Sequence, residues 1–215
     1  MNTKKEYDTY LFDLDGTIID SSPGIVASVL YALKKFGIVE PDKESLLRFI
    51  GPPLTESFQK FYGFSEEDSI QGVMYYRENY EAGGMLECSV YEGLEDTLKR
   101  LKAANKTIIV ATSKPEVYAR KILKHFELDQ YFDYIAGMEL DGGRGTKAEV
   151  IAYAFETCGI KDRSNVLMIG DREHDINGAK AMGVDSMGVL YGFGSREEFE
   201  AADATYIVET PNDIF

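Results

Sequence analysis

The sequence predicts an α/β fold: a doubly wound parallel sheet with a small all-helical cap inserted into it. Two observations carry this prediction. From residue 90 onward, short β-rich segments alternate with amphipathic helical segments, which is typical of parallel strands joined by crossover helices. Residues 22 to about 83, in contrast, contain no segment that is typical of a strand. A helical insert therefore interrupts the α/β domain after its first strand.

The pattern of apolar residues places the strands and helices of a Rossmann-like core. The first strand is expected at Thr9–Leu14, before the insert. Later strands are expected at Thr107–Ala111, Tyr134–Gly137, Val166–Ile169, Asp185–Val189 and Thr205–Val208, and helices at Leu94–Ala104, Pro115–Phe126, Lys147–Cys158 and Ile176–Met182. Pro115 suits the first position of its helix, because an N–H in the first turn has no helical partner.

Two helices are expected in the insert. Pro23 opens the first, whose apolar residues recur on one face, and Gly37 ends it. The second begins at Ser65, in a sequence typical of a capping box, and runs toward Tyr80. Tyr75, Tyr76 and Tyr80 fall at helical spacing, and we expect them to pack within the cap.

The edges of the insert have the composition of hinges, at Asp20–Pro23 and at Ala82–Gly84. The core is therefore expected to comprise residues 1–20 and 84–215, and the cap residues 21–83. An all-helical insert beside a strand end is a natural lid.

Composition limits the classes of function. The 215 residues fit one large domain with an insert, and 44% of them are hydrophobic, enough for a packed core. The net charge of −14 argues against a nucleic-acid partner, which needs a basic face. The sequence shows neither a membrane span nor a signal peptide. Two distant cysteines, Cys88 and Cys158, suit reduced thiols in the cytoplasm. We expect a monomer, or a homodimer formed through the cap.

The end of the first strand carries two acids, Asp13 and Asp15, just before Gly16. Ligands of open α/β sheets bind beyond the carboxyl ends of the strands. Two close carboxyl groups have pKa values that move apart, so that one serves as a nucleophile while the other serves as a general acid. The alternative is a simple turn at Asp15-Gly16, with Asp20 as a helix cap.

Two other segments offer groups that bind phosphate. Thr112 and Ser113 end the second core strand and combine hydroxyl donors with the N–H groups of a helix start. The alternative for Ser113 is an N-cap. Lys147 lies at a helix N-terminus, where a cation opposes the helix dipole unless it points at an anion. A solvated surface lysine is the alternative there.

A third strand end supplies further acids, Asp171 and Asp175, after the apolar segment that begins at Val166. With Asp13 they offer hard oxygen ligands, which suit Mg²⁺. Zinc is disfavoured, because the two histidines have no ligand spacing to the cysteines. We expect His174 to be exposed.

In order along the chain, these features resemble the four motifs of the haloacid dehalogenase superfamily. They are Asp13-Leu14-Asp15-Gly16-Thr17, then Thr112, then Lys147, and then Gly170-Asp171 with Asp175. The resemblance covers essentially the whole chain, since the insert resembles the small cap of this family. The segments around Thr112 and Asp171 are most similar to the phosphoglycolate phosphatase-like branch, which includes 5′-nucleotidases.

The resemblance implies a Mg²⁺-dependent phosphatase that acts on a small-molecule phosphomonoester. Asp13 would form an aspartyl-phosphate, and Asp15 would protonate the leaving oxygen and then activate water. Thr112 and Lys147 would hold the transferring phosphoryl group. Asp13, the backbone carbonyl of Asp15 and Asp171 would bind the metal, with Asp175 supporting the site directly or through Lys147 or water.

Substrate choice is expected to depend on less constrained positions. Ser113 stands where relatives often carry Asn, and its hydroxyl can still donate to phosphate. Arg48 in the cap could meet a substrate carboxylate or a second phosphate, although a solvated helix residue is the alternative. Phosphoglycolate, a 5′-nucleotide, pyrophosphate and a sugar phosphate all stay open as substrates.

Two other functions use similar residues. A phosphosugar mutase would share the same core. A receiver-like phospho-acceptor module would also cluster aspartates, Mg²⁺, a hydroxyl and a lysine on an α/β sheet, but it keeps its acyl-phosphate and needs no lid. The helical insert and the spacing of Asp13 and Asp15 favour turnover.

Overall fold

The computed structural model of the protein describes residues 5–39, 42–140 and 143–215. The chain forms two compact units. We call the first, Met1–Ile19 with Val90–Phe215, the core, and the second, Asp20–Ser89, the cap. The insert expected at residues 21–83 lies within the second range.

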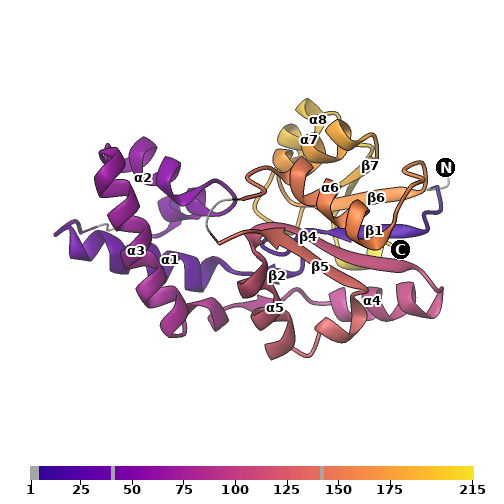
Figure 1. Ribbon diagram of the computed structural model, residues 1–215, viewed down its shortest axis with the longest axis horizontal. Helices are drawn as coiled ribbons and strands as arrows, with labels where there is room; N and C mark the ends of the chain where they lie inside the picture. Colours follow the sequence, from indigo (N-terminus) through magenta and orange to yellow (C-terminus); the bar gives the residue numbers. More distant parts are fainter. Residues whose placement is uncertain (1–4, 40–41, 141–142) are drawn as a thin grey trace. The chain divides into compact units, whose positions relative to one another are not determined.

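The core is built on a six-stranded parallel sheet in the order β5-β4-β1-β6-β7-β8 (Figure 1). Its strands are β1 (Thr9–Phe12), β4 (Thr107–Pro115), β5 (Tyr134–Met138), β6 (Val166–Gly170), β7 (Asp185–Val189) and β8 (Tyr206–Val208). All six strands expected from the sequence are present, which confirms the α/β class. A separate two-stranded sheet pairs β2 (Ile19–Asp20) with β3 (Ser89–Val90).

Strand β1 lies in the middle of the sheet and is buried along its whole length. It ends at Phe12, two residues before the predicted end at Leu14, because the chain turns there. The carbonyl of Leu14 accepts hydrogen bonds from the N–H groups of Thr17, Ile18 and Ile19. The N–H of Asp13 still bonds to Ile169 of β6, and after Asp13 the chain leaves the ladder and begins a loop at the carboxyl edge of the sheet.

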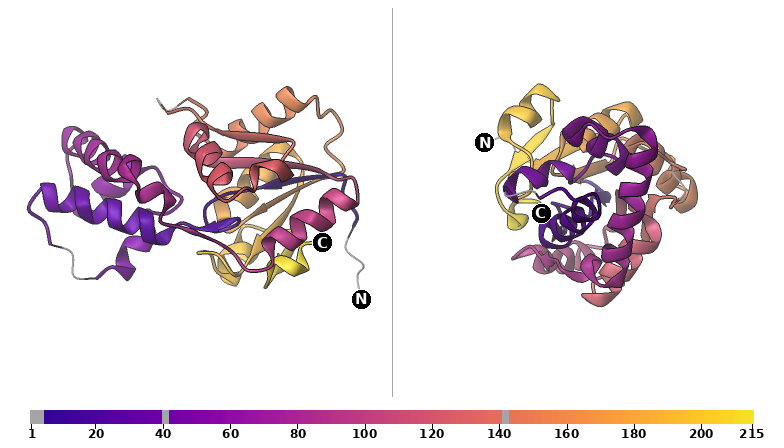
Figure 2. Two further views of the ribbon diagram at one scale, coloured as in Figure 1. Left: turned by 90° about the horizontal axis from the view of Figure 1, so that it is seen from below. Right: turned by 90° about the vertical axis from the view of Figure 1, so that its left-hand side faces the viewer.

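Helices cover both faces of the sheet (Figures 1 and 2). One face carries α4 (Leu94–Ala103) and α5 (Glu116–His125), and the other carries α6 (Lys147–Cys158) and α7 (Glu173–Met182), with α8 (Arg196–Ala201) packed beside α7. Apolar side chains of α6, such as Val150 and Phe155, pack with Leu11 of β1 and Met168 of β6. This buried apolar layer fixes the strand ends that carry the acidic residues.

Three details at the helix starts differ from the prediction. Pro115 does not open α5: it pairs with Met138 as the last residue of β4, and its ψ of 129° is extended. The residue that caps α5 is therefore Pro115 itself, so the N-cap alternative for Ser113 was wrong. Helix α7 begins at Glu173, a turn earlier than Ile176, because Asp175 accepts a hydrogen bond from the N–H of Arg172 at 3.1 Å.

The cap consists of helices α1 (Ser22–Lys35), α2 (Leu54–Tyr62) and α3 (Glu66–Ala82) with the 3₁₀ segments η1 (Glu44–Phe49) and η2 (Gly84–Leu86). Aromatic rings fill its interior, among them Phe58 stacked on Phe64. Tyr76 and Tyr80 are buried and stacked on each other, as predicted. Ser65 caps α3 by accepting a hydrogen bond from the N–H of Asp68.

Candidate active site

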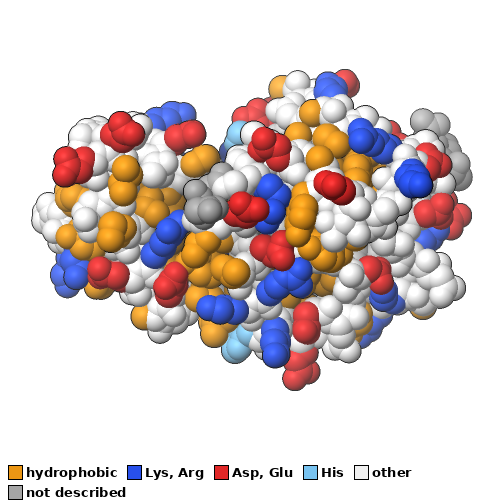
Figure 3. Space-filling view, viewed as in Figure 1, with side chains coloured by type: hydrophobic (Ala, Val, Ile, Leu, Met, Phe, Trp, Pro, Cys, Tyr) orange, Lys and Arg blue, Asp and Glu red, His pale blue; other side chains and the backbone are white. Residues whose placement is uncertain are grey.

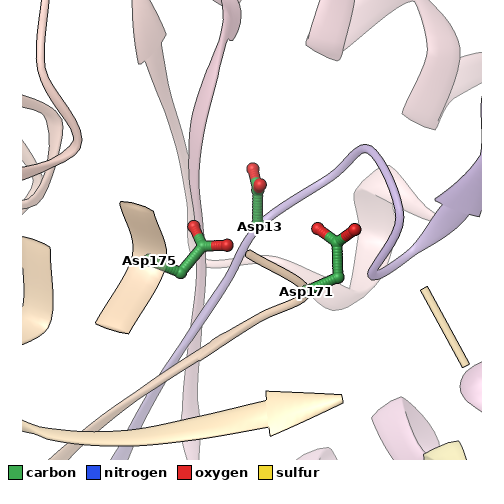
Figure 4. A group of neighbouring side chains, drawn as sticks. All are labelled: Asp13, Asp171 and Asp175. Carbon is green, nitrogen blue, oxygen red and sulfur yellow. The ribbon is translucent and has the colours of Figure 1, made fainter. Parts of the chain in front are cut away.

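The site lies at the carboxyl ends of the central strands β1 and β6. Asp13 directly follows β1, and its N–H donates to the carbonyl of Ile169 on β6 at 2.9 Å. Asp171 directly follows β6, and Asp175 lies in the first turn of α7. Carboxylate oxygens of these three residues lie within 4.8 Å of one another and point toward a common region (Figure 4).

Lys147 joins two of these carboxylates. Its Nζ lies 2.9 Å from Oδ1 of Asp13 and 2.8 Å from Oδ1 of Asp175, and it donates to the carbonyl of Ala111 at 3.0 Å. Its side chain is only 4% exposed. The lysine at a helix N-terminus is thus explained by the anions that it meets, and its contact with Ala111 places it beside Thr112.

The first turn of α6 is capped by side chains other than that of Lys147. Thr146 and Glu149 form a reciprocal capping box: the N–H of Glu149 donates to Thr146 Oγ1, and the N–H of Thr146 donates to Glu149 Oε2. Because these side chains satisfy the helix start, Lys147 is left to reach the carboxylates. The stem of Lys147 passes over Gly178 of α7, where a Cβ would lie 2.6 Å from Lys147 Cγ.

A loop after β7 fixes the orientation of Asp171. The N–H of Phe193 donates to Oδ2 of Asp171 at 2.9 Å, and the hydroxyl of Tyr191 donates to the carbonyl of Thr17 at 3.0 Å. Gly192 allows the loop to approach, because a Cβ there would lie 2.3 Å from both Asp171 Cβ and the carbonyl oxygen of Gly16. The loop is therefore a support of Asp171.

Burial and neighbouring charges shift the pKa values of several groups in this cluster. Burial raises the pKa of Asp13 to about 6, against the opposing effect of Lys147. Burial also raises the pKa of Asp171 well above its usual range, and the nearby carboxylates of Asp175 and Asp13 add to the effect. Burial alone would lower the pKa of Lys147, but Asp13 and Asp175 more than reverse this, so that its pKa is raised. The environment of this cluster thus favours the protonated forms of Asp13 and Asp171.

The arrangement fits a hard divalent cation. Within the described parts of the chain, Oδ2 of Asp13 and Oδ1 of Asp171 accept no hydrogen bond, while the other oxygen of each carboxylate does. Each residue therefore keeps one oxygen for a ligand in a largely buried, all-oxygen cluster. Mg²⁺ prefers such ligands, and a cation would offset the cost of burying these carboxylates.

The other predicted residues are placed as follows. Thr112 is buried near the end of β4, and Ser113 next to it is half-buried. Arg48 belongs to the cap, where it is exposed and its guanidinium lies 4.2 Å from the centre of the Phe61 ring. His174 is exposed, as expected.

Sequence reasoning missed Lys114. Its Nζ lies 2.8 Å from each carboxylate oxygen of Asp15, and both side chains are largely buried. Lys114 directly follows Thr112-Ser113, which we expected to bind phosphate, so its position was a usable signal. The partner could not be read from the sequence, because 99 residues separate Asp15 from Lys114. With Lys114, two lysines lie beside the four aspartates of this region.

Comparison with known proteins identifies the family of this chain. A sequence model of the haloacid dehalogenase-like hydrolases matches residues 10–189. A 5′-nucleotidase of Pseudomonas aeruginosa is 45% identical over 200 residues, which cover 93% of this chain and 90% of that protein. The tyrosine-protein kinase PtkA of Mycobacterium tuberculosis is 38% identical over 199 residues, or 92% of this chain and 67% of that protein. A crystal structure described as a predicted phosphatase from Clostridium acetobutylicum superimposes with a TM-score of 0.93 at 48% identity, covering 98% of this chain and 97% of that one.

The chain belongs to the haloacid dehalogenase-like hydrolase family. It is a phosphatase of this family, with the parallel sheet and strand-end acids described above. In the described parts of the chain, no helix is both long enough and apolar enough to cross a membrane.

Proposed function

We propose that this phosphatase hydrolyses a small phosphomonoester, of the phosphoglycolate or 5′-nucleotide type, through an aspartyl-phosphate on Asp13. The observation that carries the proposal is the buried cluster in which Lys147 bridges Asp13 and Asp175 beside Asp171. Phosphoryl transfer depends on positioning and charge neutralisation, and this cluster supplies both.

The reaction proceeds in two halves. An oxygen of Asp13 attacks phosphorus, the bond from phosphorus to the leaving oxygen breaks, and Asp15 gives that oxygen a proton. Asp15 then takes a proton from water as the water oxygen attacks the phosphoryl group, which frees Asp13 and inorganic phosphate. Lys147 and the hydroxyl of Thr112 hold the phosphoryl oxygens throughout.

Asp13, Asp171 and Asp175 would hold Mg²⁺, together with the backbone carbonyl of Asp15 that the family resemblance implies. The ion would neutralise charge on the transferring phosphoryl group. Asp175 would act partly through Lys147, whose ammonium it holds at 2.8 Å.

The similarity to a 5′-nucleotidase supports a nucleoside monophosphate as one candidate substrate. Ser113 would donate to the phosphate, and Arg48 would meet a second anionic group of the substrate. The substrate would be a free small molecule in the cytoplasm, and neither a nucleic acid nor a membrane would take part.

The test is release of inorganic phosphate from a panel of phosphate esters, with Mg²⁺ or with EDTA. The panel contains phosphoglycolate, 5′-nucleoside monophosphates, sugar phosphates, pyrophosphate and phosphotyrosine. We expect many turnovers per protein that require Mg²⁺, and a loss of at least about 10³-fold in Asp13→Asn. Asp185→Asn, on the opposite edge of the sheet, serves as the control and should retain activity.

Other results would contradict the proposal. Release of only one equivalent of phosphate would indicate a phospho-acceptor module, and a requirement for a bisphosphate activator would indicate a mutase. Normal turnover by folded Asp13→Asn would exclude Asp13 as the nucleophile.

A further inference from the structure

Lys114 and Asp15 form a two-pronged ion pair. Lys114 Nζ lies 2.8 Å from Oδ1 and 2.8 Å from Oδ2 of Asp15. The Lys114 side chain is 6% exposed and that of Asp15 is 16% exposed. Contact with both oxygens fixes the carboxyl group in position and in orientation.

The local structure of β4 places Lys114 beside the phosphate-binding segment. The register between β4 and β5 shifts between Thr112 and Pro115, and such an irregularity re-aims the chain. The N–H of Lys114 donates to Thr112 Oγ1 at 3.1 Å. The backbone of Lys114 is therefore tied to a threonine proposed to hold phosphate, while its side chain reaches the proposed acid.

A buried ion pair is weak evidence for a structural role. Removing two charges from water costs free energy, and apolar residues of similar volume often serve a fold equally well. The pair is better explained by what Asp15 does. Asp15 must stand within hydrogen-bond reach of the leaving oxygen, and a fixed carboxyl group meets that demand.

We propose that Lys114 is the positioning residue of the acid and base Asp15, an inference that rests on the function proposed above. The two-pronged pair is the carboxylate form of Asp15. In the first half of the reaction Asp15 enters protonated, the proton passes to the leaving oxygen as the bond to phosphorus breaks, and Lys114 binds both oxygens of the carboxylate that results. In the second half of the reaction the same carboxylate receives the proton of water. In this role Lys114 transfers no proton itself and acts through Asp15.

This role predicts a dependence on the leaving group. An alkoxide leaves phosphorus only with a proton from Asp15, whereas p-nitrophenolate is stable without one. kcat/KM reports the steps up to the aspartyl-phosphate, so it isolates the protonation of the leaving oxygen. A loss of phosphate binding or of folded protein would instead lower kcat/KM for every ester alike.

The experiment compares kcat/KM for a series of alkyl and aryl phosphates in Lys114→Met and Lys114→Arg. We expect Lys114→Met to lose about 10²-fold on alkyl esters and less than about fivefold on p-nitrophenyl phosphate, because general acid catalysis contributes about 10²–10⁴-fold. Lys114→Arg keeps a cation with two parallel donors and should recover most of the loss on alkyl esters.

Lys106→Met is the matched control. Lys106 is also a buried, ion-paired lysine and directly precedes the same strand β4, but at its opposite end. Lys106→Met should leave kcat/KM unchanged for every ester of the series. In addition, Lys114→Met introduced into Asp15→Asn should cause no further loss on alkyl esters, because the two residues act as a unit.

Equal losses on alkyl and p-nitrophenyl esters in Lys114→Met would overturn the proposal, as would an unchanged series. Additive losses in the double variant would also overturn it. The proposed function is tested separately: it would be contradicted by normal turnover in Asp13→Asn. A failure of that proposal can therefore be told apart from a failure of the role of Lys114.

Discussion

Both edges of the parallel sheet carry buried lysines, but the acidic partners of these lysines differ in their exposure to water. At the amino edge, Lys106 pairs with Glu6 and Asp8, whose side chains are 78% and 72% exposed. At the carboxyl edge, Lys147 pairs with Asp13 and Asp175, whose side chains are 13% and 1% exposed. Water therefore solvates the acids of the first edge and is largely excluded from those of the second.

The difference supports the carboxyl edge as the place of the proposed chemistry. A pair with one solvated partner costs the fold little, whereas several buried carboxylates cost free energy until a cation balances them. The carboxyl edge is also where the loops after parallel strands converge. The unfavourable charges gather at the edge where a phosphoryl group and its metal would bind.

Charges of both signs are mixed on the face of the molecule that Figure 3 shows. On the face in Figure 3, Lys and Arg side chains lie among Asp and Glu side chains. On this face the net charge of −14 thus coexists with a local mixture of acidic and basic side chains.

Replacing one lysine at each edge tests the comparison most strongly. Lys147→Met should lower the free energy of unfolding of the metal-free protein by about 3–5 kcal/mol, because it leaves buried carboxylates unpaired. Lys106→Met should lower it by less than about 1 kcal/mol, because Glu6 and Asp8 stay solvated. Urea denaturation of the metal-free variants measures both values. Equal losses of unfolding free energy in the two variants would show that the two edges do not differ in the cost of leaving their acids unpaired.

A smaller effect is expected from the loop that supports Asp171. Gly192→Ala places a methyl group against Asp171 and Gly16, and should weaken divalent-cation binding about 10–100-fold, as supports of metal ligands do. Titration with Mn²⁺, followed by electron paramagnetic resonance, measures this affinity without turnover.

Gly188→Ala is the matched control for this loop. A Cβ at Gly188 would lie 2.5 Å from the Phe199 ring, so packing is disturbed to a similar degree without contact to Asp171. Similar Mn²⁺ affinities in the two variants would mean that the loop does not position Asp171.

The smallest effect concerns pH. Because the folded-state pKa values of Asp13 and Asp171 are raised, the folded protein binds protons more tightly than the unfolded chain. The metal-free protein should therefore lose stability as pH rises from about 4 through about 6. Asp171→Asn should weaken this loss and raise Tm at pH 7 by about 2–4 °C for each kcal/mol recovered.

Thermal unfolding with and without Mg²⁺ checks this prediction. Mg²⁺ should raise the Tm of the parent protein at pH 7 and have little effect on Asp171→Asn. A lower Tm in metal-free Asp171→Asn would contradict the view that this carboxylate costs stability.

The sequence predicted the sheet because its strands are apolar and buried on both faces. That pattern predicted Val166–Ile169 and the tip at Asp171, and Thr9–Leu14 with the tip at Asp13. Errors arose where side chains and turns act on the backbone, at Leu14, Pro115 and the first turn of α7. Such contacts are local, but the spacing of apolar residues along the chain does not reveal them.

The sequence by itself determined the α/β class, the strand order along the chain and the acids at the strand tips, because hydrophobic period and strand-end position are local properties. Only the tertiary structure decided which charges meet. The pairing of Lys114 with Asp15, the bridge of Lys147 and the approach of Gly192 to Asp171 each join segments far apart in the chain. Burial and its effect on pKa likewise depend on what packs around a carboxylate, and no single segment contains that information.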